Sequence, residues 1–110
     1  LALEAKLKLT FGDSDVLVGK VVNGWPIDFY VQSIDTFIQL DGVYWHGLDK
    51  PIENIQKSMT NRDQHIFRVW KKDRKQNAFF KKAGLKLHRI TDVDASNIDT
   101  LDAFIANIKT

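Results

Sequence analysis

The sequence predicts a single α/β domain with a central mixed β-sheet flanked by helices. Three short runs rich in β-branched and aromatic residues follow one another closely, at about residues 16–22, 25–31 and 36–41, and this composition is typical of a β-meander. A long stretch with helical periodicity, 62–83, precedes another strand-like run at 85–90. A strand that follows a long helix is reached by a crossover connection, so we expect the sheet to be mixed.

The first eleven residues are compatible with two structures. Apolar residues alternate strictly with other residues from Leu1 to Phe11, which favours a strand, whereas the abundance of Ala, Leu, Glu and Lys favours a helix that Gly12 can end. We expect the helix.

The connection between the first two predicted strands is clearer. Asn23-Gly24 is the strongest signal for a two-residue hairpin, and Pro26 indicates a strand start or a sheet edge.

The second hairpin carries the first candidate site. Polar residues near Ser33 suit a tight turn, and a turn centred there sets Asp28 opposite residue 39, 40 or 41. In the registers that pair Asp28 with Gln39 or Asp41, the two side chains share a face with Cβ atoms roughly 5 Å apart. The hairpin therefore offers one carboxylate, beside an amide or a second carboxylate, at a separation that a metal ion can bridge.

Two further helices are predicted, besides a short helix or ordered loop at 49–57. Thr60 and Asn61 can cap the helix at 62–83, and Gly84 ends it. Its inward stripe should contain Ile66, Val69, Trp70, Asp73, Asn77 and Phe80, so that Asp73 faces the sheet. The amphipathic stretch 97–109 should turn inward Ile98, Leu101, Phe104, Ile105 and Ile108.

Positive charge is concentrated in one part of the chain. Ten of the sixteen Lys and Arg residues lie within 62–89, against only Asp63 and Asp73, whereas 92–110 carries four Asp and one Lys. Clustered cations are typical of a phosphate-binding surface. We expect phosphates to contact the cations on the long helix, namely Arg68, Lys71, Lys72, Arg74 and Lys75.

The order and spacing of several motifs match a known nuclease family. Asp28 is followed thirteen positions later by Asp41-Gly42-Val43-Tyr44-Trp45-His46-Gly47, then by the basic helix with its internal Asp73, and then by Gly84-Leu85-Lys86-Leu87-His88-Arg89-Ile90. This arrangement resembles the very-short-patch-repair (Vsr) endonuclease family. It is most similar to the related phage homing endonucleases, whose signature is written E, D, x, H, D. The resemblance covers most of the chain and implies a restriction-endonuclease-like fold of the PD-(D/E)XK type.

The resemblance implies a metal-dependent DNA endonuclease that hydrolyses phosphodiester bonds with Mg²⁺ or Mn²⁺. Asp28 and the main-chain carbonyl of Leu40 would hold the metal, since Mg²⁺ needs few carboxylates when waters and phosphate oxygens complete its shell. His46, whose ordinary pKa near 6.5 suits proton abstraction, would activate water. Asp73 would orient His46, because a carboxylate on an apolar stripe needs a partner.

The remaining candidates have ordinary structural explanations as well. Glu4 matches the Glu of the signature by position, but any exposed helix carries such a residue. Trp45 resembles an aromatic that wedges between stacked bases, and it also suits a packing role. Asp41 can contact the metal or its waters, or can simply form a turn with Gly42. Asp73 can form a salt bridge with a neighbouring Lys or Arg instead of orienting His46.

One departure from the wider superfamily leaves an alternative function open. The superfamily pattern is an Asp followed by Glu-x-Lys, whereas this triplet reads Gln39-Leu40-Asp41 and lacks both the Glu and the Lys. The alternative is therefore a catalytically silent DNA-binding module that retains the nuclease fold.

Composition narrows the class of protein further. The 110 residues contain no cysteine, which excludes a disulfide scaffold and a thiolate zinc site, so we expect no zinc. No apolar run approaches the ~20 residues of a membrane span, and no signal peptide is recognisable. We expect a cytoplasmic protein of a bacterial cell, phage-encoded or bacterial. The chain lacks an initiator Met, which indicates either a catalytic domain excised from a longer protein, as we expect, or processing of the N-terminus. No helix-turn-helix or zinc module fits beside the catalytic region, so we also expect a separate DNA-recognition domain in the full-length protein. A homo-oligomer is equally compatible with the sequence.

Overall fold

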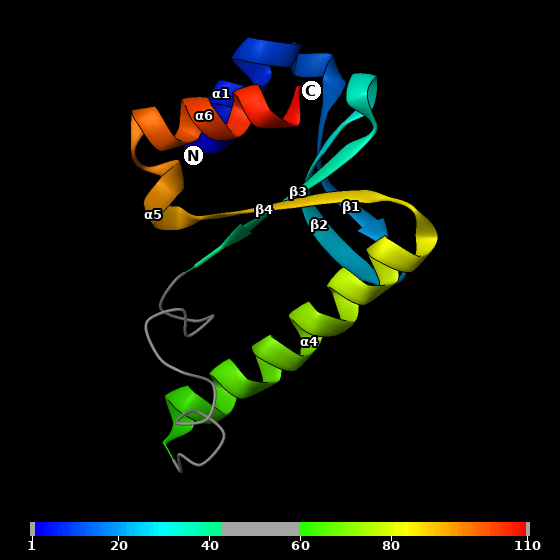
Figure 1. The fold of residues 1–110 in the computed structure, drawn as a ribbon, viewed down its shortest axis with the longest axis vertical. Helices are drawn as coiled ribbons and strands as arrows, with labels where there is room; N and C mark the ends of the chain where they lie inside the picture. Colours follow the sequence, from blue (N-terminus) through cyan, green and yellow to red (C-terminus); the bar gives the residue numbers. More distant parts are fainter. Residues whose placement is uncertain (1, 43–59, 110) are drawn as a thin grey trace.

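The computed structural model describes residues 2–42 and 60–109. Its elements, shown in Figure 1, are α1 (Ala2–Phe11), β1 (Val16–Val22), β2 (Trp25–Val31), β3 (Thr36–Asp41), α4 (Asn61–Ala83), β4 (Lys86–Thr91), α5 (Asp92–Ala95) and α6 (Ile98–Ile108), with short 3₁₀ turns at Asp13–Asp15 and Gln32–Ile34.

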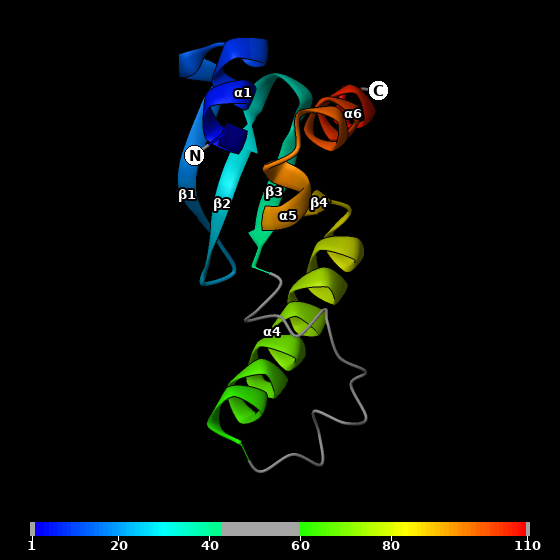
Figure 2. The ribbon, with the colours of Figure 1, turned by 90° about the vertical axis from the view of Figure 1, so that its left-hand side faces the viewer.

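The strands form one mixed sheet in the order β1-β2-β3-β4. β1 to β3 are antiparallel neighbours, and β4 returns through α4 to lie parallel to β3. The predicted meander with a crossover strand is confirmed. Helices α1, α5 and α6 cover one face of the sheet and α4 lies on the other (Figures 1 and 2). Within the described residues, no helix is both long and apolar enough to cross a membrane.

The larger core lies between the sheet and α1, α5 and α6. Leu3 and Leu7 of α1 are fully buried against Val31 and Ile38, whereas Leu9 is 81% exposed. Burial at an interval of four residues, rather than two, is the pattern of a helix face. It confirms that the N-terminal stretch is a helix despite its alternating leucines.

A smaller aromatic core joins the sheet to the C-terminal half of α4. Phe80 is almost completely buried against Ile27 and Phe37, and the rings of Phe37 and Phe80 meet edge-on at 5.3 Å. Edge-to-face pairs of this kind stabilise a core beyond the area they bury. The N-terminal half of α4 extends past the sheet, so only the later turns of α4 are positioned by it (Figure 2).

In strand β2, the face of the sheet to which the buried residues point changes at Asp28. Ile27 belongs to the core on the α4 side, while Phe29 and Val31 belong to the core on the other side. Residues 27 and 29 of a regular strand would share a face. Gly19, the residue of β1 opposite Asp28 in the β1–β2 register, has a φ of +71°, a conformation that glycine adopts readily. Strand β2 therefore switches the face of its core residues at the position of the candidate metal ligand.

The helix ends follow the sequence closely. Thr60 accepts a hydrogen bond from the Asp63 amide at the start of α4, and Gly84 ends the helix with a φ of +71°. Asn97 caps α6 in the same manner as Thr60 caps α4. These caps satisfy backbone groups that a helix terminus otherwise leaves without partners.

Two details of the predicted inward faces are wrong. Gln76, rather than Asn77, is the buried amide of α4, and Ile98 is 61% exposed at the first turn of α6. Gln76 lies three residues after Asp73 and four before Phe80, so it continues the buried face. The short helix α5, between β4 and α6, was not predicted, and the segment predicted as a helix or loop at 49–57 lies outside the described residues.

Candidate functional site

Asp28 and the end of β3 form a connected group. The β2–β3 register pairs Phe29 with Ile38, and its next position sets Asp28 opposite Gln39, one of the predicted registers. The Asp28 amide donates to Oε1 of Gln39 at 3.1 Å, and Oδ2 of Asp28 accepts from the Leu40 amide at 2.8 Å. The half-buried Asp28 carboxylate is thus held beside the Leu40 main chain, as the predicted metal site requires.

The same face of the sheet carries a cation that the sequence did not single out. The β3–β4 register pairs Gln39 with Arg89, so Asp28, Gln39 and Arg89 form a row across three strands. Nη1 of Arg89 donates to Oδ1 of Asp41 at 2.8 Å, and Nε donates to Oδ1 of Asn77 at 2.8 Å. Nη2 donates to Oε1 of the buried Gln76.

Asp73 also faces this cation, as the salt-bridge alternative predicted. Its Oδ1 lies 3.6 Å from Nη1 of Arg89, and both side chains are less than one-fifth exposed. The predicted orientation of Asp73 toward the sheet is therefore confirmed. Since one guanidinium faces both Asp41 and Asp73, it offsets part of the repulsion between their carboxylates.

The group can be assessed as a site for Mg²⁺. Asp28 supplies one carboxylate and Leu40 a neighbouring main-chain carbonyl, a small set of oxygen ligands of the kind that Mg²⁺ accepts with several waters. Oδ1 of Asp41 is already bonded to Arg89, and Oε1 of Gln39 to the Asp28 amide. Asp28 also has one bonded oxygen, Oδ2, but it combines a carboxylate with the adjacent Leu40 main chain, which makes it the best candidate to hold the ion. Within the described residues, no cluster of three or more His, Asp or Glu side chains is arranged around a metal position.

Glu4 lies apart from this group. It is on α1, in the layer on the opposite face from α4, and its carboxylate accepts a hydrogen bond from Nζ of Lys8 at 2.8 Å. This hydrogen bond, together with the charge of Lys8, lowers the pKa of Glu4 and raises that of Lys8. No contact of the described residues joins Glu4 to Asp28. Trp45 and His46 lie outside the described residues.

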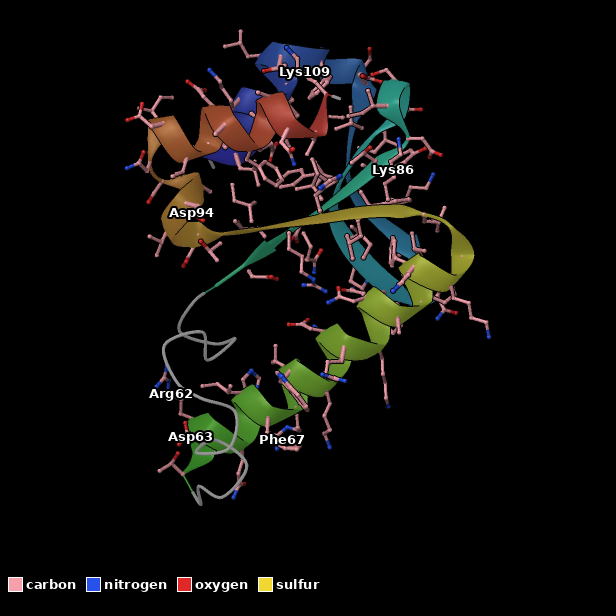
Figure 3. All side chains as sticks on the ribbon, in the orientation of Figure 1. Arg62, Asp63, Phe67, Lys86, Asp94 and Lys109 are labelled. Carbon is pink, nitrogen blue, oxygen red and sulfur yellow. The ribbon has the colours of Figure 1, made fainter. Side chains whose placement is uncertain are left out.

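The predicted DNA-contacting cations are all exposed on α4. They are Arg68, Lys71, Lys72, Arg74 and Lys75. Two of them stack on aromatic rings of the same helix: Lys71 lies 4.9 Å from the Phe67 ring centroid and Arg74 lies 4.9 Å from that of Trp70. Phe67, Arg62 and Asp63 mark the part of α4 that extends beyond the sheet (Figure 3). Stacking restrains these flexible side chains without neutralising their charge.

The comparisons with known proteins leave the family open. No family model, curated protein or solved structure significantly matches this chain. The candidate site is therefore defined by its own geometry.

Arg89 and Gln76 are the site residues that sequence reasoning missed. The available signal for Gln76 was its position three residues after Asp73 and four before Phe80, both of which lie on the predicted inward stripe. Arg89 carried a weaker signal, because it was counted only among the cations of 62–89. Its contact with Asp41 joins residues 48 positions apart, and such a pair depends on the strand register rather than on local sequence.

Proposed function

We propose that this chain is a metal-dependent DNA endonuclease domain, Vsr-like or homing-type, with a restriction-endonuclease-like fold. The observation that carries the proposal is the Asp28 carboxylate held beside Leu40, in one cross-strand row with Gln39 and with Arg89, whose side chain bonds the basic helix α4. A carboxylate at the border of a cationic surface is suited to meet a phosphate that the cations have attracted. The proposed substrate is double-stranded DNA.

Each residue has a distinct proposed role. Asp28 and the Leu40 carbonyl would hold Mg²⁺ or Mn²⁺, which would supply Lewis-acid stabilisation of charge on the scissile phosphate. His46 would take a proton from the attacking water, and Asp73 would orient His46 and stabilise its protonated form. Asp41, held by Arg89, would be a further ligand or a partner of the metal's waters. Glu4 and Trp45 are further candidates, Glu4 in catalysis and Trp45 as a wedge between bases.

The contact between Arg89 and Asp73 bears on the proposed role of Asp73 in orienting His46. Nη1 of Arg89 lies 3.6 Å from Oδ1 of Asp73, so the two side chains form an ion pair beside the sheet. Each carboxylate oxygen can accept more than one hydrogen bond, so this ion pair does not by itself exclude a hydrogen bond from the His46 imidazole. The ion pair and the proposed orientation of His46 are therefore compatible.

A catalytically silent DNA-binding module is the second candidate. Two observations favour it. Gln39 supplies an amide opposite Asp28, where a second carboxylate would strengthen metal binding. Asp41, the other carboxylate near Asp28, has one oxygen bonded to Arg89. Such a module would keep the fold and the cations of α4 while cutting nothing.

Nicking or cutting of a supercoiled plasmid distinguishes the two candidates. We expect cleavage with Mg²⁺ or Mn²⁺, none with EDTA, and a loss of at least about 100-fold in Asp28→Asn, because the substitution removes the charge that holds the ion. Asn retains an oxygen that accepts from the Leu40 amide, so the fold should survive, as circular dichroism can verify. Equal cleavage by wild type and folded Asp28→Asn would refute the assignment of Asp28. No cleavage by the wild type with either ion would favour the silent module.

A further inference from the structure

An open groove of about 540 Å³ runs between the C-terminal half of α4 and the outer edge of β4. Four consecutive residues of β4, from Lys86 to Arg89, line it. Consecutive side chains of a strand point to opposite faces of the sheet, so a groove on one face would be lined by every second residue only. Because all four consecutive residues line this groove, it must lie along the edge of β4. β4 is the last strand of the sheet, so this edge has no neighbouring strand among the described residues.

The walls of the groove favour an anion. Its polar lining residues are neutral or cationic, and no Asp or Glu is among its described lining residues: Asn77, Lys81, Lys86, His88 and Arg89. Lys81 and Lys86 are exposed and lie on the two opposite walls. Leu85 and Leu87 contribute apolar surface between them. A cationic rim over an apolar floor suits the phosphates and sugars of a nucleic-acid strand.

The groove continues the cationic surface of α4. Trp70, Arg74, Asn77 and Lys81 follow one another at intervals of four, three and four residues, so they form one row along the helix. Arg74, stacked on Trp70, and Lys81, in the groove, are about 10 Å apart along the axis. The other α4 cations, such as Lys72 and Lys75, lie off this row.

One end of the groove, at Arg89, lies near the candidate metal site. Arg89 lines the groove and stands in one cross-strand row with Gln39 and Asp28. Two strand spacings separate Arg89 from Asp28, or about 10 Å. About three nucleotides of a strand span this distance at 3.4 Å each.

We propose that this groove binds the phosphate backbone of double-stranded DNA and carries one strand along the β4 edge as far as Arg89, about two strand spacings from Asp28. Lys81 and Lys86 contact phosphates from opposite walls, and outward amides of the β4 edge donate to phosphate oxygens as backbone amides do elsewhere. The inference rests on the proposed function, which names DNA as the substrate. So far only the cations of residues 68–75 have been proposed to contact that DNA. It adds the path that the strand takes.

The test measures DNA binding as a function of salt, in an Asp28→Asn background that prevents cleavage. A fluorescent 20-base-pair duplex is titrated with three proteins. The first carries Asp28→Asn alone, the second also carries the groove pair Lys81→Gln and Lys86→Gln, and the third instead carries the control pair Lys20→Gln and Lys109→Gln. The control pair removes the same charge from exposed lysines on β1 and at the end of α6. Lys109 and Lys86 are labelled in Figure 3, which shows them on different layers of the molecule.

We expect the groove pair to reduce the slope of log K against log salt by about 1.8, because each phosphate contact contributes about 0.9, and the control pair to leave the slope unchanged. Equal slopes for all three proteins, or equal reductions by both pairs, would overturn the groove while leaving the proposed function standing. Absence of binding by every variant would overturn both. A positive result is independent of cleavage, which the plasmid assay measures separately.

Discussion

At the scale of single residues, one guanidinium joins the sheet to α4. Arg89 bonds Asp41 on β3 and both Gln76 and Asn77 on α4, and it faces Asp73. Arginine suits this position because its planar fork presents several donors in fixed directions and stays charged. The arrangement holds Asp41 and Asp73 near the face that carries Asp28.

Replacing Arg89 should destabilise the fold. We expect Arg89→Met to lower the free energy of unfolding by about 2–4 kcal/mol, since the buried Gln76 and the nearly buried Asp41 each lose a charge-assisted hydrogen bond. Urea denaturation followed by circular dichroism measures the change. Arg68→Met, on the exposed face of α4, is the control and should shift stability by less than about 0.5 kcal/mol. Similar midpoints for the two variants would contradict the role given to Arg89.

At the scale of elements, the C-terminus of α4 sets where β4 begins. Gly84 adopts a φ of +71°, its amide donates to the Lys81 carbonyl at 3.2 Å, and the Leu85 amide donates to the Phe80 carbonyl at 2.9 Å. This left-handed cap reverses the chain from the helix into the edge strand. The site depends on it, because β4 carries Arg89.

Substitution of Gly84 tests the cap. No atom lies within 4 Å of a Cβ added at Gly84, so the cost of Gly84→Ala comes from the backbone conformation alone. We expect a loss of about 1 kcal/mol for Ala and a smaller loss for Asn, which tolerates the left-handed region better. Thermal and urea unfolding of the two variants provide the comparison. An Ala variant as stable as wild type would show that the backbone relaxes at this point.

Helix α1 offers a pH-dependent test. The Lys8 hydrogen bond lowers the pKa of Glu4 below its ordinary value of 4.5, so the folded state holds this proton less tightly than the unfolded state. The contribution of Glu4 to stability is therefore present above its unfolded pKa and is lost as the pH falls through its folded pKa. We expect Lys8→Gln to raise the pKa of Glu4 in an NMR titration.

Lys6→Gln is the matched control for this titration. Lys6 pairs with Asp102 of α6 at 2.9 Å rather than with Glu4, so the pKa of Glu4 should stay where it is in the wild type. A Glu4 pKa that is the same in all three proteins would contradict the pairing of Glu4 with Lys8.

At the scale of the whole molecule, charge is divided between the two helical layers. α4 and β4 carry the cations of residues 68–89, whereas α5 and α6 carry Asp92, Asp94, Asp99 and Asp102. A duplex approaching from the α4 side meets attraction, and one approaching α5 and α6 meets repulsion. The polarity is stronger than the net charge of +2 implies.

This polarity predicts weak binding that depends on salt. Phosphate contacts orient a protein on DNA without reading its sequence. We therefore expect the 110 residues to bind unrelated duplexes with similar Kd values of roughly 10⁻⁴ to 10⁻⁶ M, and to lose affinity steeply as salt rises. Titrating two unrelated duplexes at two salt concentrations measures both effects. Nanomolar binding that prefers one duplex would reveal a base-reading element in the chain.

The sequence by itself determined the described elements and their approximate ends, except for the short helix α5. Strand composition, the period of α4, and the residues Asn23-Gly24, Thr60, Gly84 and Asn97 act over a few neighbouring positions, so their effect is local. The mixed order of the sheet also followed, because a crossover after a long helix leaves few alternatives. The sequence limited the partner of Asp28 to three positions without choosing among them.

Only the tertiary structure decided which of these residues meet. Packing of both sheet faces selected the register that pairs Asp28 with Gln39 and Gln39 with Arg89, since a shift of one residue would turn every side chain to the opposite face. The same packing buries the amide of Gln76 rather than that of Asn77. The contacts of Arg89 with Asp41 and α4 arise from this long-range packing, which no local pattern encodes.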